Sequence, residues 1–196
     1  MTRVTGSGNV VIESRSVSEF SGLVVNGAGR VFIDQTGTES LTITTDDNFL
    51  PYIETQVRDG KLMIEFKPKV VPNNLKDLTF RLTVKDLNSI ELNGAVALEG
   101  RGIEASQMAV TISGAGAVKL TGKVDQLSVT LSGTGAHNSE NLECKRAMVT
   151  NNGAGAAIVR VSDELNATIN GIGFIEYIGN PKLTKGVHGL GVVSQR

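Results

Sequence analysis

The chain has 196 residues, 40% of them hydrophobic, which is enough to bury one sizeable core in a single elongated domain or a closely packed pair. Nineteen Lys plus Arg stand against twenty Asp plus Glu, and this balance argues against a basic surface for nucleic acid or an anionic membrane. The lack of Trp, with only two Tyr and six Phe, leaves few aromatic platforms on which sugars or bases could stack.

The start of the chain carries no recognisable export signal, because no charged segment followed by an apolar run lies near Met1. We expect that any such signal has been removed or never existed. No stretch elsewhere reaches the roughly 18 apolar residues of a membrane span. Cys144 is the only cysteine, so an internal disulfide and a multi-cysteine metal site are excluded and a buried thiol is expected.

The first half of the chain divides into two predicted sections. Residues 1–33 are expected to form opening strands and a first coil, the latter in the segment VVNGAGRVFI from Val24 to Ile33. Residues 34–89 are expected to form an antiparallel β section that covers one end of a stack of coils. Within it, Asp59-Gly60 lies between two alternating runs and predicts a tight hairpin.

Residues 90–196 are dominated by an internal repeat, which predicts regular coils that continue the first section as one structural unit. Apolar-alternating segments recur, each ending at a glycine, and these glycines are Gly27, Gly94, Gly114, Gly133, Gly153, Gly171 and Gly189. The last five gaps between them are 20, 19, 20, 18 and 18 residues. A spacing near nineteen is too regular for chance and sets the length of one coil.

The alternation within each copy has a period of two, which is typical of β-strands. The residues four and two before each glycine are mostly apolar and are expected to face inward, although the last, degenerate copy places Lys185 and Val187 there. The residue three before the glycine is threonine in four successive copies: Thr111, Thr130, Thr150 and Thr168. The pattern predicts an all-β fold, a right-handed parallel β-helix with coils of about 19 residues. An antiparallel sandwich is the rival interpretation.

Ten glycines are expected to form the structural turns of the coils, because glycine adopts a positive φ without a steric penalty. They are Gly27, Gly94, Gly114, Gly116, Gly133, Gly135, Gly153, Gly155, Gly171 and Gly173. A second turn is expected about eight residues later in each coil, at Gly102, Gly122, Asn141 and Gly179.

The repeat motifs resemble those of bacterial adhesins with the head GIN domain, a domain of unknown function also described as a putative auto-transporter adhesin head. The matching pieces include Asn93-Gly94, Ser113-Gly114-Ala115-Gly116 and Asn170-Gly171-Ile172-Gly173, and the segment from Gly8 to Phe20 with Arg15 is similar as well. The resemblance implies a β-helical fold and a location in the bacterial cell envelope, in the periplasm, at the outer membrane or outside the cell.

Acidic residues on the third side of successive coils form one candidate ligand stripe: Glu104, Asp125, Glu143 and Asp163. Neighbouring coils would bring such carboxylates about 5 Å apart, close enough to bind Ca²⁺ or to supply an acid and a base. The alternative interpretation is a solvated corner whose charge is neutralised by Lys123, Lys145, Arg146 and Arg160. Glu99 and Glu176 lie four coils, roughly 19 Å, apart, which excludes them as a catalytic carboxylate pair.

Two further features invite a functional interpretation. Asp46, Asp47 and Asn48 could ligate a metal, but they lack the rest of a calcium loop and are expected to form an exposed acidic turn. His137 falls at an inward position, and a core or coil-end histidine is favoured over a functional one.

The sequence therefore predicts a non-enzymatic envelope or surface protein, an adhesin or binding scaffold that presents a β-helix face to a surface glycan or protein and needs no cofactor or metal. One alternative is a carbohydrate-active β-helix enzyme, a lyase or glycosidase. The other is a self-assembling structural protein that forms homo-oligomers through its coil ends.

Overall fold

A computed structural model describes residues 2–196 and shows an all-β protein with one short 3₁₀-helix. The elements of the first half are β1 (Thr2–Thr5), β2 (Val10–Arg15), β3 (Gly22–Gln35), β4 (Ser40–Asp46), η1 (Asp47–Tyr52), β5 (Ile53–Arg58), β6 (Lys61–Phe66), β7 (Val70–Asn73) and β8 (Leu78–Val84). Those of the second half are β9 (Ser89–Ile112), β10 (Ala117–Leu131), β11 (Ala136–Asn151), β12 (Ala154–Ile169), β13 (Ile172–Ile178), β14 (Lys182–Val187) and β15 (Leu190–Gln195).

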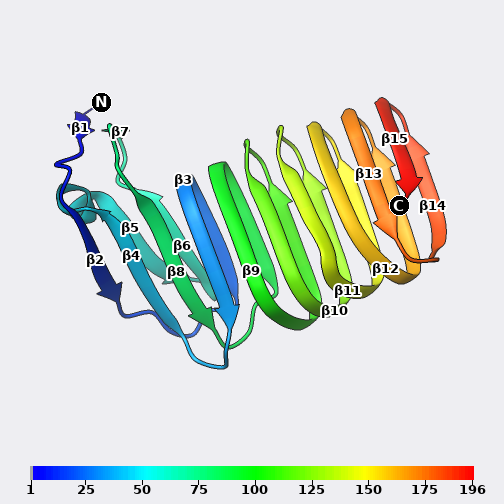
Figure 1. Cartoon of the computed structure of the whole chain (residues 1–196), viewed down its shortest axis with the longest axis horizontal. Coiled ribbons are helices and arrows are strands. Elements are labelled where there is room, and N and C mark those ends of the chain that lie inside the picture. The colour runs from blue at the N-terminus through cyan, green and yellow to red at the C-terminus, as the bar shows by residue number, and fades with distance from the viewer. Residues whose placement is uncertain (1) are drawn as a thin grey trace.

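The strands form one large mixed sheet in which parallel pairing predominates, as the ordered row of ribbons in Figure 1 shows. Its order over the described residues is β15-β13-β12-β11-β10-β9-β3-β8-β4-β2, with β14 paired to β12 and β6 paired to both β3 and β5. A separate two-stranded sheet joins β1 to β7. The strands from β9 onward pair only in parallel, and each residue aligns with one 18 to 20 positions further along the chain in the regular parts of the ladder.

The section before β9 contains the antiparallel pairs, namely β2 with β4, β4 with β8 and β5 with β6. The predicted hairpin is confirmed, since Arg58 pairs with Lys61 across Asp59 and Gly60, which have φ angles of 51° and 72°. The section is not wholly antiparallel, because β6 and β8 run parallel to β3. β3 is thus the junction, with β6 and β8 on one edge and β9 on the other.

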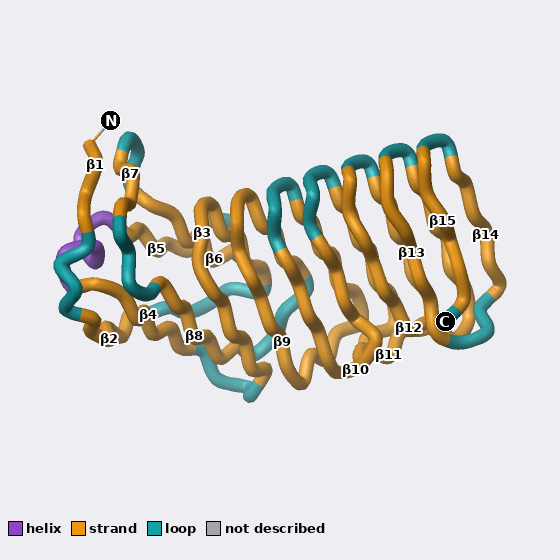
Figure 2. Tube along the Cα trace, turned by 45° about the horizontal axis from the view of Figure 1, so that its top comes forward, coloured by secondary structure: helices purple, strands orange, loops and turns teal. Residues whose placement is uncertain are grey.

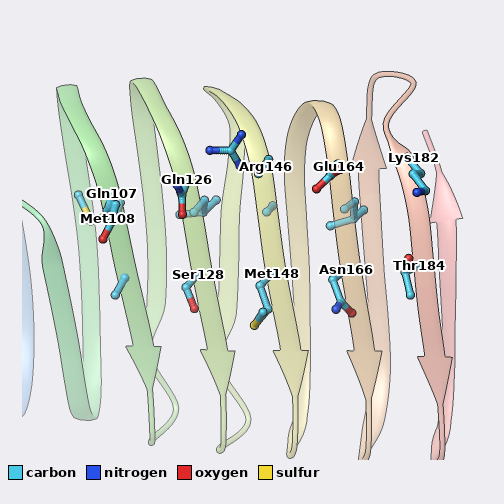
Figure 3. Close-up of a pocket in the computed structure, with 14 residues that line it drawn as sticks. Gln107, Met108, Gln126, Ser128, Arg146, Met148, Glu164, Asn166, Lys182 and Thr184 are labelled. Carbon is cyan, nitrogen blue, oxygen red and sulfur yellow. The ribbon is translucent and has the colours of Figure 1, made fainter.

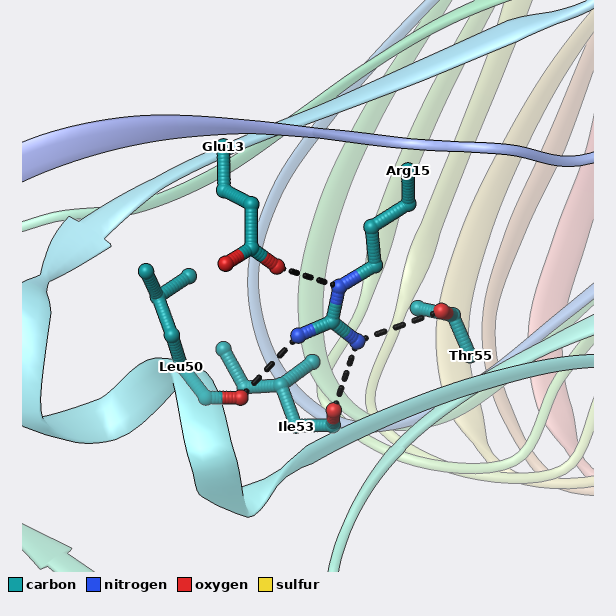
Figure 4. Close-up of polar contacts among 5 residues, drawn as sticks. All are labelled: Glu13, Arg15, Leu50, Ile53 and Thr55. Carbon is teal, nitrogen blue, oxygen red and sulfur yellow. Dashed lines mark hydrogen bonds and ion pairs between the residues drawn. The ribbon is translucent and has the colours of Figure 1, made fainter.

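Arg15 fastens the opening strand to this section (Figure 4). Its Nε atom lies 2.8 Å from Glu13, while Nη1 donates to the Ile53 carbonyl at 2.6 Å and the Thr55 hydroxyl at 3.1 Å. Nη2 donates to the Leu50 carbonyl at 3.0 Å. By donating to the backbone carbonyls of Leu50 and Ile53, the charged Arg15 side chain holds β2 against η1 and β5. The arginine of the family-like segment is therefore a structural residue.

The core runs along the inside of the stack. The predicted inward positions of the regular copies are buried, at most 2% exposed: Leu23, Val25, Ile90, Leu92, Val110, Ile112, Val129, Leu131, Val149, Asn151, Ala167 and Ile169. Lys185 and Val187 are exposed instead, in β14, which pairs only with β12 among the described residues. The four threonines align in register as one outward column across β9 to β12. None of the helices in the described residues is long and apolar enough to cross a membrane.

The glycines of the repeat stack directly on one another, from Gly27 against Gly94 through to Gly171 against Gly189. A β-carbon on Gly114 would overlap the carbonyl oxygen of Gly94, and the same overlap recurs at each step up to Gly189. The positive φ expected at all ten turn glycines is found at Gly27, Gly94 and Gly173. The positive-φ argument is wrong for the other seven. At Gly114, Gly133, Gly135, Gly153, Gly155 and Gly171 a β-carbon would crowd a backbone carbonyl oxygen of a neighbouring strand, so the close approach of two backbones requires glycine there; at Gly116 the nearest atoms would lie 3.2 Å away.

The second turn is found as expected at Gly179, which has a φ of 114° and lies between β13 and β14, but the other three positions differ from the expectation. Gly102 and Gly122 lie inside the long strands β9 and β10, with φ angles of 62° and 133°, and the ladder shifts register beside them. Asn141 lies inside β11, where a similar shift occurs between Ser139 and Glu143. These corners are bulges in a continuous ladder.

Candidate binding groove across the coils

A groove of about 520 Å³ crosses five successive strands, β9, β10, β11, β12 and β14 (Figure 3). The floor is formed by buried residues at one register position: Met108, Leu127, Ala147 and Leu165. Because successive side chains of a strand point to opposite faces, the residues before and after each floor residue point outward and form two walls.

The first wall is the column Gln107, Gln126, Arg146, Glu164 and Lys182, which the strand register aligns one residue to a coil. The second wall is the column Ala109, Ser128, Met148, Asn166 and Thr184. Figure 3 shows the first row above the second, with Glu164 between Arg146 and Lys182. Met148 is the one large apolar side chain of the walls and is 55% exposed.

The polar side chains of the walls have no hydrogen-bond or ion-pair partner among residues 2–196. They are Gln107, Gln126, Ser128, Arg146, Glu164, Asn166, Lys182 and Thr184. Polar ladders elsewhere on the stack do bond to themselves, as Asn93 does to Asn26 at 2.9 Å and Asn170 to Asn152 at 2.7 Å. The walls of the groove therefore offer a row of free donors and acceptors that repeats about every 4.8 Å.

The acidic stripe expected from the sequence is not a column in the structure. Lys123 aligns with Glu104 on one side and Glu143 on the other, and Glu143 aligns next with Arg160. This column alternates acid and base. Carboxylates that alternate with cations do not converge on one Ca²⁺ ion, and no group of three metal-binding side chains exists among the described residues.

Asp125 belongs to a neighbouring position, where its carboxylate lies 2.8 Å from the Lys145 ammonium. The hydrogen bond and charge of Lys145 lower the pKa of Asp125. Asp163 accepts a hydrogen bond from the Ser162 hydroxyl at 2.6 Å. A second hollow, of about 540 Å³, covers this corner, and two of the three cations that line it are occupied: Lys145 by Asp125, and Arg160 by the Glu140 carbonyl at 2.6 Å.

The Asp46 cluster fastens a loop; Asp47 is exposed, as the sequence suggests, but Asp46 is not. Asp46 is fully buried, and its carboxylate accepts the backbone amides of Gly8 at 2.7 Å and Lys76 at 2.9 Å. Asp47 accepts hydrogen bonds from Ser7 and Asn9, with Ser7 the larger cause of its lowered pKa. These bonds join the segment before β2 to the end of β4, the start of η1 and the residues just before β8.

The interior of the β11 coil is unusually polar. His137 is 1% exposed, as its inward position predicts, and neither ring nitrogen has a partner among the described residues. Burial lowers the pKa of His137 to about 4, so the ring is neutral at pH 7. Cys144 is also buried, and burial, with a smaller effect of Asp163, raises the pKa of its thiol to about 12. Both groups are packed in the core, although Cys144 also lines the second hollow.

The groove was not predicted from the sequence, because the predicted ligand site was based on acidic residues. Its first wall is nonetheless readable there, since Gln107, Gln126, Arg146, Glu164 and Lys182 follow one another at intervals of 19, 20, 18 and 18 residues. That is the spacing of the glycines, shifted along the coil.

The fold and the groove define a class, an all-β protein that presents polar ladders from a large, mostly parallel sheet. The chain belongs to the family described as "Putative auto-transporter adhesin, head GIN domain", whose model matches residues 19–181. The membership inferred from the glycine motifs is thereby confirmed.

Solved structures of similar fold include proteins from Bacteroides and Parabacteroides. A putative adhesin from Bacteroides fragilis is 21% identical with a TM-score of 0.80, covering 98% of this chain and 100% of its own. A putative adhesin from Parabacteroides merdae is 18% identical with a TM-score of 0.65, over 99% of both chains. A putative lipid binding protein from Parabacteroides distasonis is 18% identical with a TM-score of 0.58, over the full length of both. At these identities the likeness is one of fold alone. No curated protein matches the chain.

Proposed function

We propose that this protein is a non-enzymatic binding module of the bacterial cell envelope, which presents the groove across β9 to β14 to a partner at a cell surface. The observation that carries the proposal is the row of eight wall side chains that have no partner within the protein. Polar groups that are left free in an ordered row are available to a ligand at no cost in broken internal bonds. The adhesin description of the family supports the same function and an envelope location.

The chain supports this role as a single β-helix, in which residues 1–33, 34–89 and 90–196 form one continuous unit. The backbone amide of Ala109 donates to the Asn88 carbonyl and that of Ser113 to the Leu92 carbonyl, both at 2.9 Å, so β9 returns onto its own beginning. β10 has 15 residues and is joined to β11 by four, a connection too short to span a straight strand of about 50 Å. The winding traced in Figure 2 fits closed coils.

The groove lacks the carboxyl pair of a glycosidase. Glycosidases use two carboxyl groups roughly 5 to 9.5 Å apart, and Glu164 is the only acidic residue among the groove's lining. Because glycoside hydrolysis requires two carboxyl groups, a binding role fits the groove better than hydrolysis.

The proposal is tested with purified protein and envelope extracts of bacterial and host cells. We expect retention of a component by the wild-type protein, weaker retention by Arg146→Gln, and full retention by Lys119→Gln, which removes the same charge from a different face. Reducing-sugar release is measured in parallel. Equal retention by the two variants would remove the groove from the function, and sugar release would establish an enzyme.

A second candidate function, self-assembly, is favoured by one observation at the C-terminal end of the stack. Ile172 and Phe174 of β13 align with Leu190 and Val192 of β15, and the four side chains are 42% to 76% exposed. Each of β14 and β15 has one edge without a partner strand in the described residues. An apolar face beside open strand edges is suited to a second copy of the chain.

Light scattering after size-exclusion chromatography tests this candidate. A concentration-dependent dimer that Leu190→Lys abolishes would support self-assembly. A protein that stays monomeric at high concentration would contradict self-assembly and leave the groove as the proposed binding surface.

A further inference from the structure

The free charges of the groove have a defined spacing. Arg146 aligns with Glu164, and Glu164 aligns with Lys182, so the two cations lie two coils apart with a carboxylate between them. Two steps of the stack amount to about 10 Å. We propose that the groove binds a linear polysaccharide in which a uronic acid alternates with a neutral sugar, lying along the stack with successive carboxylates at Arg146 and Lys182. This inference rests on the proposed function of the groove and names its ligand class.

The polysaccharide is expected to lie along the groove, parallel to its two walls. An extended polysaccharide advances per sugar by a length close to one coil, so a disaccharide repeat brings its carboxylate back after two coils. Arg146 and Lys182 then each meet a carboxylate, and Arg146 can bind its carboxylate in a bidentate manner. Glu164 faces the intervening neutral sugar, where it accepts hydrogen bonds from hydroxyl groups.

The rest of the walls suits hydroxyl and amide groups. Gln126 and Gln107 extend the first wall beyond Arg146, and each amide both donates and accepts. On the opposite wall, Ser128, Asn166 and Thr184 stand at the same spacing (Figure 3). Met148 supplies an apolar surface for the face of one sugar ring.

Other occupants fit less well. A peptide that adds a strand to a sheet needs an open backbone edge, whereas β10 and β11, which carry the middle of the groove, are paired with a neighbouring strand on both sides. An amphipathic helix needs a wide apolar stripe, and Met148 is the one large apolar side chain that the groove exposes. Nucleic acid would place a phosphate against Glu164.

The position of Glu164 also predicts selectivity among acidic polysaccharides. A chain with a carboxylate on every sugar places one of them against Glu164, where like charges repel. We expect stronger binding to hyaluronan or unsulfated heparosan, both of which alternate, than to polygalacturonate.

The experiment measures binding of the full chain to hyaluronan and heparosan oligosaccharides by calorimetry, with carboxyl-reduced hyaluronan and polygalacturonate as controls. We expect binding of at least one alternating polymer, loss on carboxyl reduction, and weakening by about fivefold or more in Arg146→Gln and in Lys182→Gln. Lys119→Gln is the matched control and should bind as the wild type does. Glu164→Gln should reduce the preference for the alternating polymers over polygalacturonate. Melting curves verify that each exposed-site variant is folded.

The two proposals fail in different ways. If the wild-type protein retains an envelope component through Arg146 but binds neither alternating polymer, the polysaccharide inference is overturned and the binding function stands. Protease-sensitive retention has the same meaning, because it identifies a protein partner. Binding of the polymers that Arg146→Gln and Lys182→Gln leave unchanged would also overturn the inference. Absence of both kinds of binding would overturn both proposals.

Discussion

Gly114 lies against Gly94 of the preceding coil so closely that a β-carbon on Gly114 would overlap the Gly94 carbonyl oxygen. The backbone of one coil thus occupies the space that a side chain on the next would need. Seven glycines form this contact in sequence, which explains why the repeat retains glycine where the φ angle does not demand it.

We expect Gly114→Ala to destabilise the protein by about 1–3 kcal/mol, because the added methyl group must push two coils apart. Gly186→Ala is a matched control, since Gly186 lies in a strand without a positive φ and the nearest atom to its β-carbon belongs to the His188 side chain, 3.3 Å away. Urea unfolding monitored by circular dichroism measures both. Equal stability losses would refute the backbone-contact argument.

The inward and outward assignments are tested at two adjacent residues. Ile112 is fully buried, whereas Thr111 stands half-buried in the outward threonine column. Ile112→Asp should cost about 3 kcal/mol or more, because it buries an unpaired carboxylate, while Thr111→Asp should cost less than about 1 kcal/mol. Ile112→Val should cost about 0.5–1.5 kcal/mol. Similar melting shifts for the two Asp variants would contradict the assignment.

His137 should make the protein sensitive to acid. Burial lowers its pKa to about 4 in the folded state from an ordinary value of 6.5. Above pH 6.5 the ring is neutral in both states and contributes no pH dependence. Between pH 6.5 and 4 the unfolded chain takes up the proton and the folded chain does not, so the free energy of unfolding falls as the pH falls. The loss through this group reaches about 3 kcal/mol at pH 4.

His137→Leu should remove that part of the pH dependence without loss of stability at pH 7, because the wild-type ring leaves both nitrogens unpartnered. His188→Gln, at an exposed position, should leave the dependence unchanged. Unfolding curves at pH 7, 6, 5 and 4 give the comparison. A His137→Leu protein that loses stability with acid as steeply as the wild type would show that other groups carry the effect.

Calcium should not stabilise the protein through the acidic corner. Glu104 and Glu143 are separated by Lys123, and Asp125 is paired with Lys145. A site that bound the folded state would add about 2.7 kcal/mol at a hundredfold excess of calcium over the dissociation constant. A thermal melt in calcium should therefore match one in chelator. A rise of several degrees that Asp125→Asn abolishes would mean that the corner binds calcium.

The repeat made much of the fold predictable from sequence. The glycine spacing gives the parallel register from Gly94 to Gly171, and Asp59-Gly60 gives the hairpin, because both depend on local backbone requirements. The corners were not predictable. Coils of 18 to 20 residues absorb their unequal lengths in bulges, and the shift near Gly122 brings Lys123, and not Asp125, beside Glu104. The sequence also could not predict that the groove side chains lack hydrogen-bond partners, because this depends on which neighbouring side chains come within bonding distance.

The repeated glycine contact makes the coil a unit of length. Every coil from β9 to β12 meets its neighbours through the same backbone positions, so removing one whole coil, such as residues 114–132, brings Gly133 to the place of Gly114 on Gly94. We expect such a deletion to fold where a deletion of half that length does not, as in other stacked repeats. Deleting or inserting whole coils would then change the length of the molecule in steps of about 4.8 Å. The number of sugar units that its groove spans would change by one with each increment.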